Sequence, residues 1–541
     1  MRLLASVFVL ITLLNSCYKG KNVDLIIHNA QIHVMNEKMQ VFDAIAIKDG
    51  EIVQVGPERE ILNEYSAERV INAKQKDIFP GLHDAHGHIM SLAEQMQSVD
   101  LRGTRSYNEL ILKLSKYQQK HNKKFIIGRG WDQSLWNESN LPNNKLLNET
   151  FPNTPVALTR IDGHAMLVND AMLKYAGIDG NTEVEGGIIN KKGEKLTGIL
   201  LDNAIDLIKT KLPKSNKEDL KKAILNIQKK LFSLGITHVH EAGLKNNQLD
   251  LFIELTNENK LNLNVYAMLF PTEKNIEFAK KHGHYKSGPL SVRSFKLIVD
   301  GSLGSHGACM LEPYSDSTTH GILLESHSRI QTILNTAKEL NYQLNSHCIG
   351  DSANRIMLKA IDTTMKQTSD HRWRIEHAQV VHPNDFELFR SSKVIPSVQP
   401  THATTDQRWA EKHIGEERLS GAYAYRSLKE KCGLILFGTD FPVESFDPFT
   451  TIHAAVNRKD TKNKPINGFH TKESLDLNTT LKAMTSWAAI GCFEENNVGT
   501  LEKGKSATLV ILDHKMEINS EYLPNYAYMT IVNGDIVFSM E

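Results

Sequence analysis

The sequence lacks an excess of either charge, since 63 lysines and arginines balance 63 aspartates and glutamates in its 541 residues. It also lacks a basic stripe with interleaved aromatic side chains. Proteins that bind nucleic acid concentrate positive charge on one face, because the phosphate backbone provides much of the affinity. These absences exclude nucleic acid as the expected partner and favour a small-molecule substrate.

Cysteine is scarce as well. Of the five cysteines, those beyond the N-terminal segment are Cys309, Cys348, Cys432 and Cys492, and none belongs to a CxxC pair. Zinc knuckles and redox-active pairs need cysteines at such short spacing, so both kinds of site are excluded. The sequence leaves open whether any of these cysteines form disulfides.

Beyond its N-terminus the sequence has no apolar run long enough to cross a bilayer. The run from Leu3 to Leu14, preceded by Arg2, is too short for a comfortable span but suits a secretory signal. Its end, Leu-Asn-Ser-Cys17, resembles the lipobox of bacterial lipoproteins. We predict a signal peptide over 1–17 and a lipidated Cys17 that anchors the protein to a bacterial membrane in the cell envelope. The alternative is a plain cleaved signal and a secreted or periplasmic protein.

Alternating apolar and polar residues near both ends of the chain predict half-buried strands. The first set begins at Val23 and includes a hairpin turn at Asp49-Gly50. A similar set near the C-terminus turns at Asn533-Gly534. We therefore predict one small β-sandwich domain built from both termini, over 23–75 and 500–541.

Between these ends, over 76–499, strand patterns alternate with helical patterns. The predicted strands are 78–84, 236–241, 263–269, 292–299, 343–348, 372–377, 394–398 and 434–438. This number suits an α/β fold, the (β/α)₈ or TIM-like barrel. A large insertion, about 100–232, follows the first strand and carries strands of its own. An insertion at the loop side of a barrel is expected to shape the substrate pocket.

Polar residues follow several of the predicted strands. His86 and His88 stand two positions apart after the first, so their side chains point the same way and can hold one metal ion. Other strands carry Lys296, His347, His377 and Asp440 at or near their ends. Each has an ordinary structural explanation, but functional groups of barrels gather at the carboxyl ends of the strands. Together they form a nearly complete two-metal site.

The motifs in the chain are, in order, PGLHDAHGH, GRGWDQSLW, DGHAMLVN, FKLIVDGSLGS, SHCIGDSAN, RIEHAQ, SVQPTHATTD and FGTDFPVE. With these motifs the sequence resembles the amidohydrolase superfamily of metal-dependent barrel hydrolases. It is most similar to amidohydrolase family 3, which includes N-substituted formamide deformylase-like proteins. The resemblance extends from DLIIHNAQI near the N-terminus to the closing NGDIV.

The resemblance implies a divalent metal, zinc, as one or two ions. Its ligands would be His86, His88 and Asp440 for one ion, His347 and His377 for the other, and Lys296, carboxylated on its amine, as the bridge. Carbamate formation needs an uncharged amine, and burial beside cations lowers the pKa of a lysine. A nitrogen and oxygen donor set suits zinc.

The implied function is hydrolysis of a C–N bond in a non-peptide or N-substituted amide. A hydroxide formed at the metals would attack the carbonyl carbon, with Asp440 as general base and later acid. Two alternatives remain open. The same site could hydrolyse esters or lactones, or the chain could be a catalytically silent, lipid-anchored binding protein.

Four further motif residues are candidates for substrate binding. Trp131, Asp132 and His164 lie in the insertion, and His402 follows the seventh strand. His402 or His164 could also take part in catalysis by polarising the carbonyl oxygen. The alternative is that they are buried structural residues. His306 stands where the family often has arginine, a departure that concerns substrate preference, and a homodimer is left open.

Overall fold

A computed structural model describes residues 20–137, 141–163, 165–184, 187–213, 216–366, 368, 370–517, 521–522 and 524–540. The predicted signal peptide with Cys17 and the candidate His164 lie outside the described residues. No helix in the part that the structure describes is long and apolar enough to span a membrane.

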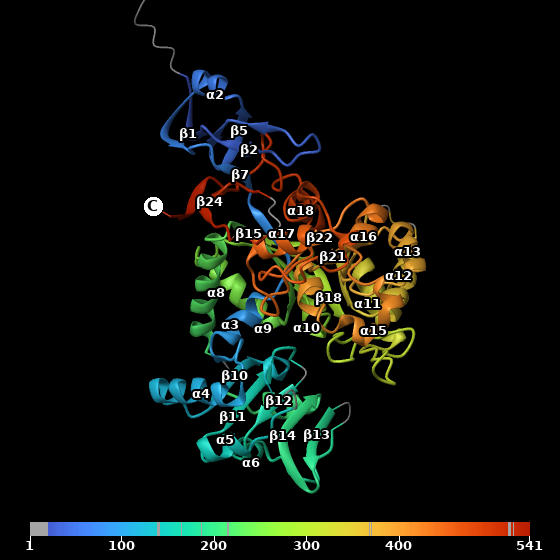
Figure 1. Ribbon diagram of the computed structural model, residues 1–541. Helices are drawn as coiled ribbons and strands as arrows, with labels where there is room; N and C mark the ends of the chain where they lie inside the picture. Colours follow the sequence, from blue (N-terminus) through green and yellow to red (C-terminus); the bar gives the residue numbers. More distant parts are fainter. Residues whose placement is uncertain are drawn as a thin grey trace, which may run out of the picture.

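The centre of the molecule is a parallel barrel sheet (Figure 1). In chain order its strands are β8 (Leu82–Gly87), β15 (Ile236–Leu244), β16 (Asn264–Leu269), β18 (Leu290–Ile298), β19 (Gln343–Cys348), β20 (Arg374–His377), β21 (Ile395–Val398) and β22 (Leu436–Phe437). Each strand pairs in parallel with the next, and β17 (Tyr285–Ser287) adds an antiparallel pairing to β18. The sequence prediction of a TIM-like (β/α)₈ barrel is confirmed.

The start of the barrel differs from the predicted strand 78–84. The structure divides this apolar run at Gly81 into β7 (Asp77–Pro80) and β8. β7 pairs with a C-terminal strand, whereas β8 pairs with β15 in the barrel. A Cβ atom at Gly81 would lie 2.2 Å from the Thr237 hydroxyl oxygen, so only glycine fits where the chain crosses between the two sheets. His86 consequently lies within the first barrel strand rather than after it.

Helices cover the outside of the barrel. They are α8 (Lys217–Phe232), α9 (Asn246–Asn257), α10 (Glu273–His282), α11 (His327–Glu339), α12 (Asp351–Met365), α13 (Phe386–Ser391), α14 (Pro400–Asp406), α15 (Ala410–Leu419), α16 (Tyr425–Cys432), α17 (Pro448–Asn457), α18 (Leu477–Ala483) and α19 (Ser486–Gly491). α8 illustrates why they form. Its residues Leu220, Ile224, Ile227 and Leu231 are buried at helical spacing, and the Asn216 side chain accepts a hydrogen bond from the N–H of Glu218 at its start.

Strands from both termini form two further sheets. The four-stranded sheet contains β1 (Lys21–His28), β4 (Ala44–Lys48), β5 (Glu51–Gly56) and β6 (Tyr65–Asn72). The six-stranded sheet contains β2 (Gln31–His33), β3 (Val41–Phe42), β7, β23 (Leu509–Leu512), β24 (Ala527–Val532) and β25 (Asp535–Ser539). Ile27, Ile47, Leu509 and Ile531 belong to one buried cluster, so the two sheets share an apolar core. This is the predicted β-sandwich.

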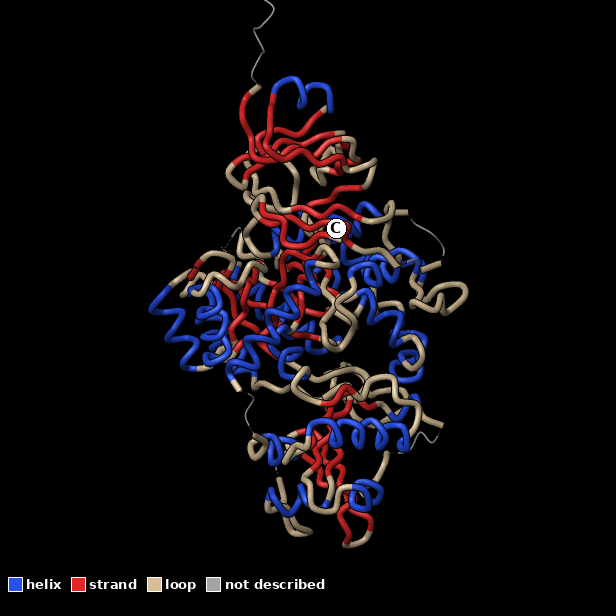
Figure 2. The backbone as a smooth tube through the Cα atoms, turned by 90° about the vertical axis from the view of Figure 1, so that its left-hand side faces the viewer, coloured by secondary structure: helices blue, strands red, loops and turns tan. Residues whose placement is uncertain are grey.

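The insertion forms its own six-stranded sheet. Its strands are β9 (Val99–Asp100), β10 (Ile126–Trp131), β11 (Val156–Arg160), β12 (Ala165–Val168), β13 (Gly187–Lys192) and β14 (Lys195–Asp202), and its helices are α4 (Tyr107–His121), α5 (Lys145–Thr150), α6 (Asp170–Ala176) and α7 (Ala204–Lys209). The insertion leaves the barrel after α3 (Ile89–Gln95), which follows β8. Figures 1 and 2 show it at one end of the barrel and the sandwich at the opposite end. The insertion therefore covers the end where the strands terminate.

Candidate metal centre

The carboxylate that follows β22 meets the two histidines at the end of β8. Oδ1 of Asp440 lies 2.9 Å from Nε2 of His88 and 3.6 Å from Nε2 of His86. The donor atoms of these three residues all lie within 4.8 Å of one another. Nζ of Lys296, on β18, lies 2.9 Å from Nε2 of His86. The structure thus brings together the side chains predicted for one metal ion, with the lysine beside them.

Further imidazoles surround this group. The ring centroids of His347 and His377 are 4.4 Å apart, and His377 lies 4.9 Å from the ring of His86. Nε2 of His402 lies 3.7 Å from Oδ2 of Asp440. Nε2 of His347 is buried and has no hydrogen-bond partner among the described residues. Oδ1 of Asp300 lies 3.8 Å from this nitrogen, beyond hydrogen-bond distance. Since a buried nitrogen without a hydrogen bond is costly, this atom is well placed to bind a metal ion.

A buried carboxylate of β8 attaches the last barrel strand to the first. Asp84 accepts hydrogen bonds from the N–H of Thr439 at 3.0 Å, the Thr439 hydroxyl at 2.6 Å and the N–H of His86 at 3.2 Å. The N–H of Asp440 donates to the carbonyl oxygen of His86 at 2.7 Å. These bonds hold Asp440 against β8, although the two segments are far apart in the sequence.

The orientation of His86 is set by a buried carboxylate that sequence reasoning did not identify. Oε2 of Glu376 lies 2.5 Å from Nδ1 of His86, and its Oε1 lies 2.7 Å from Nε of Arg374. Burial alone would raise the pKa of Glu376, but Arg374 and His86 hold it below its usual range. An ionised carboxylate only accepts, so His86 donates from Nδ1 and keeps the lone pair of Nε2 for a metal. The available signal was the position of Glu376 in the RIEHAQ motif, next to His377.

Two more side chains missed by sequence reasoning orient predicted ligands. Oε1 of Gln399 lies 2.7 Å from Nδ1 of His377, so this ring also donates from Nδ1 and keeps Nε2 free. The Glu241 carboxylate accepts hydrogen bonds from the N–H groups of Ile89 at 2.5 Å and Met90 at 3.2 Å. These N–H groups begin α3 directly after His88, so Glu241 fixes the backbone that carries this histidine.

The protonation states of these groups fit a divalent metal. Burial lowers the pKa of His86 to about 4 and that of His347 to about 3, so both are neutral near pH 7, the form that ligates metals. Burial would raise the pKa of Asp440, but the hydrogen bond with His88 and the proximity of His86 hold it well below its usual range. Burial lowers the pKa of Lys296 to about 8. Neutral imidazoles, including that of His347 with its buried Nε2, and an ionised carboxylate form a donor set that could hold one or two ions.

The structure gives two candidate substrate-binding residues partners inside the insertion. Trp131 is fully buried in the core of this segment, and its indole N–H donates to the carbonyl oxygen of Leu158 at 2.8 Å. Oδ1 of Asp132 accepts from the N–H of Ser134 and from Nη2 of Arg160, both at 3.0 Å. These contacts give both side chains structural partners within the insertion, and their part in substrate binding stays a prediction.

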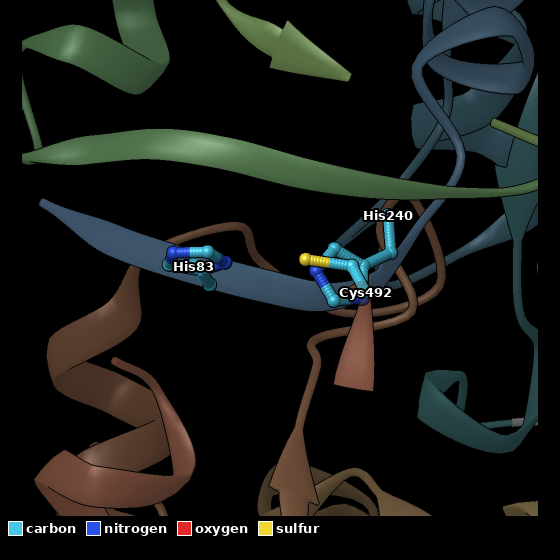
Figure 3. Close-up of side chains that lie close together, drawn as sticks. All are labelled: His83, His240 and Cys492. Carbon is cyan, nitrogen blue, oxygen red and sulfur yellow. The ribbon is translucent and has the colours of Figure 1, made fainter. Parts of the chain in front are cut away.

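A second group of potential ligands lies inside the barrel. Figure 3 shows His83, His240 and Cys492 close together, and their donor atoms lie within 4.8 Å of one another. Nδ1 of His240, however, lies 2.9 Å from Nη1 of Arg374. Because arginine only donates, Nδ1 of His240 accepts this bond, and the proton of the neutral ring must be on Nε2. That nitrogen has no lone pair for a metal ion, so this group is not assigned as a metal site.

His306, noted as a departure from the family pattern, belongs to a third group. Its Nε2 lies 2.8 Å from Oδ1 of Asp316, whose Oδ2 lies 2.8 Å from Nδ1 of His413. Each nitrogen can donate to the carboxylate, so hydrogen bonds account for the whole arrangement. The group attaches the loop after β18 to α15.

A family model, that of the amidohydrolase family (Amidohydro_3), matches residues 69–538. The chain belongs to the amidohydrolase family. This amidohydrolase is similar to Protein LONG AFTER FAR-RED 3 of Arabidopsis thaliana, with 29% identity over 94% of this chain and 93% of the relative. It is 23% identical to the N-substituted formamide deformylase of Arthrobacter pascens, over 91% of this chain and 93% of that protein.

A solved structure supports the same assignment. An uncharacterized metal-dependent hydrolase from Pyrococcus horikoshii superimposes with a TM-score of 0.77 and 28% identity, over 91% of this chain and 97% of its own. The family, this likeness and the donor set around Asp440 agree with one another. The amidohydrolase is a metal-dependent hydrolase that uses a divalent metal.

Proposed function

We propose that this amidohydrolase hydrolyses the C–N bond of a non-peptide or N-substituted amide. The observation that carries the proposal is the position of the ionised Asp440, 2.9 Å from His88 and 3.7 Å from His402, amid side chains suited to a metal. A carboxylate in this place can exchange protons with both an attacking water and a departing amine. The similarity to an N-substituted formamide deformylase also supports this substrate class.

The metal is proposed to be zinc, as one or two ions. Its ligands would be His86, His88, Lys296, His347, His377 and Asp440. A zinc site of imidazole nitrogens and carboxylate oxygens matches the usual preference of this ion. When bound, the metal would supply Lewis acidity to the substrate carbonyl and to the attacking water. Lys296 would be carboxylated on Nζ, which replaces a positive charge among the ligands by a negative one with two oxygens.

Asp440 and His402 would then have separate roles in hydrolysis. Asp440 would take a proton from the attacking water as the new C–O bond forms. His402, beside Asp440, would donate a hydrogen bond to the substrate carbonyl oxygen, which gains negative charge. As the C–N bond breaks, Asp440 would deliver the proton to the amine nitrogen, giving a carboxylate and an amine. His164 stays a candidate for the same role as His402.

Metal removal and reloading test this function. Dialysis against a chelator is expected to abolish hydrolysis of N-substituted formamides and other non-peptide amides, and stoichiometric zinc is expected to restore it. Ester and lactone analogues, assayed with the same preparations, provide the comparison. Turnover of esters without any amide would favour the ester hydrolase alternative. A fully metal-loaded protein without turnover of either class would favour a binding protein.

We also propose that Cys17 anchors the protein to a membrane. Cys17→Ser is expected to move the protein from the membrane fraction to the soluble fraction, or to block processing of the signal, because stable attachment needs the acyl chains on this residue. Fractionation with immunoblotting, and the mass of the mature N-terminus, would check this result. Membrane fractionation that is unchanged, together with normal cleavage, would contradict the proposal and leave a plain signal peptide.

A further inference from the structure

The insertion presents one arginine whose environment differs from that of its neighbours. Arg129 lies on β10, and the pairing of β10 with β11 is irregular between Arg129 and Trp131. The residue between them, Gly130, has a left-handed φ of 100°. Such an irregularity redirects a side chain that would otherwise share a face with the residue two positions away. Trp131 enters the core of the insertion, whereas Arg129 is only half-buried.

The side chain of Arg129 has no hydrogen-bond or ion-pair partner in the part of the chain that the structure describes. Two other arginines of this segment, Arg160 and Arg102, do have side-chain partners. Arg160 donates to Gln133, Asp132 and Asp162. Arg102 donates from Nε and Nη2 to the two oxygens of Asp100, at 2.9 and 2.8 Å. Of these three arginines, only Arg129 has a half-buried guanidinium whose five N–H donors bind no described residue.

Charged side chains of the insertion and of the barrel act on Arg129 from beyond ion-pair distance. Asp162, Glu94 and Asp440 all act electrostatically on its guanidinium, although none of them comes within ion-pair distance in the described structure. Glu94 belongs to α3, directly after His88, and Asp440 is a proposed metal ligand. Figure 1 shows β10 on the side of the insertion that faces the barrel. Arg129 therefore belongs to the strand of the insertion that faces the end of the barrel where the candidate metal ligands lie.

We propose that Arg129 binds a carboxylate of the substrate, so that the amide hydrolysed at the metal centre carries an anionic group. A guanidinium pairs with a carboxylate through two parallel hydrogen bonds, a geometry that fixes the orientation of the ligand. A partly buried cation without a partner is unfavourable, and an anionic substrate would relieve this cost on binding. The inference rests on the proposed amide hydrolysis and adds to it the class of substrate.

The test compares substrates that differ by a single carboxylate. Each N-formyl amino acid of a panel, in both enantiomers, is paired with the N-formyl amine that lacks the carboxylate. Arg129→Ala is expected to lower kcat/KM for the carboxylates by about 10- to 100-fold, the usual range for a hydrogen bond to a charged group, and to change it less than about threefold for the amines. Arg129→Lys is expected to recover part of the loss, because it keeps the charge but not the paired N–H groups.

Arg102→Ala is the matched control. It removes the same charge from the same segment, but the guanidinium that is lost already donates hydrogen bonds to Asp100. It is expected to leave the preference for carboxylates unchanged. Equal losses for both members of each pair in Arg129→Ala, or a wild type without preference for the carboxylates, would overturn the inference.

Calorimetric titration of zinc-loaded protein with the same panel separates this inference from the proposed function. If no amide is hydrolysed, but an N-formyl amino acid binds the wild type and not Arg129→Ala, the carboxylate subsite stands and the proposed reaction fails. If amines are hydrolysed and the amino acids neither bind nor react, the reaction stands and the subsite is wrong. Absence of both binding and turnover for every carboxylate also overturns the subsite.

Discussion

Replacing Lys296 by alanine is expected to remove most of the bound metal and nearly all turnover. The side chain is buried on β18, with Nζ 2.9 Å from Nε2 of His86. As an ammonium group, Lys296 would repel metal ions bound by the surrounding imidazoles. As a carbamate, it would offer two oxygens to the metal ions. Because changes to the partners of metal ligands already cost about 10- to 100-fold, loss of a bridging ligand should reduce kcat/KM by about a thousandfold or more.

Lys221→Ala provides a matched control for this substitution. Lys221 is also a buried lysine, but it lies on α8 and pairs with Glu254 and Glu258. Its loss is expected to lower stability without changing the metal content. Metal analysis, circular dichroism and kinetics on both variants therefore separate a ligand from a structural lysine. A full metal complement and wild-type rate in Lys296→Ala would show that the two-metal assignment is wrong.

Restoration by small molecules would identify the chemistry that Lys296 supplies. The space left by the side chain in Lys296→Ala can admit a short carboxylic acid, whose oxygens replace those of the carbamate. Formate or acetate is therefore expected to recover part of the metal binding and part of the turnover, whereas a short amine should not. Recovery by the amine alone would indicate that the uncharged lysine, rather than its carbamate, acts at the centre.

The sequence predicted the barrel because strand patterns alternate with helical patterns, and this information is local. It placed the first strand at 78–84, whereas the structure divides this run between β7 and β8. The residues of a continuous apolar run do not show that its two halves pair with different sheets. The division depends on the pairing of β7 with β2 near the N-terminus and with β23 at the far end of the chain. The β-sandwich could still be predicted from the strand patterns and hairpin turns near both termini, although β4, β7 and β23 prove to be buried along almost their whole length rather than on one face.

The candidate metal ligands could be found from sequence because they recur in short motifs. Their supporting side chains could not. Glu376 and His86 are 290 positions apart, and their contact depends on the closure of the barrel. Likewise, the sequence cannot distinguish an arginine that binds its neighbours, such as Arg160, from one whose side chain has no partner among the described residues, such as Arg129. Such differences arise from sheet register and from the irregularity beside Gly130.

Removal of the buried carboxylate of Glu376 is expected to have the second large effect, on both metal binding and stability. Glu376→Ala is expected to weaken metal binding by about 10- to 100-fold, because His86 loses the acceptor that holds Nε2 toward the metal. It is also expected to lower the free energy of unfolding by about 3–5 kcal/mol, since the fully buried guanidinium of Arg374 loses its ionic partner. Competition with a chelator measures the first effect, and chemical denaturation of the metal-free proteins measures the second.

Two further variants distinguish the role of Glu376 from a general effect of losing a carboxylate. Glu376→Gln keeps the shape of the side chain but not its charge, so it should cost less stability than alanine and still weaken metal binding. Asp316→Asn changes a carboxylate that also lies between histidines, His306 and His413, away from the proposed ligands. It is expected to leave metal affinity unchanged. If Glu376→Gln and Asp316→Asn both retain wild-type metal affinity, the contact between Glu376 and His86 does not set the orientation of this ligand, and the assignment of His86 Nε2 to the metal loses its support.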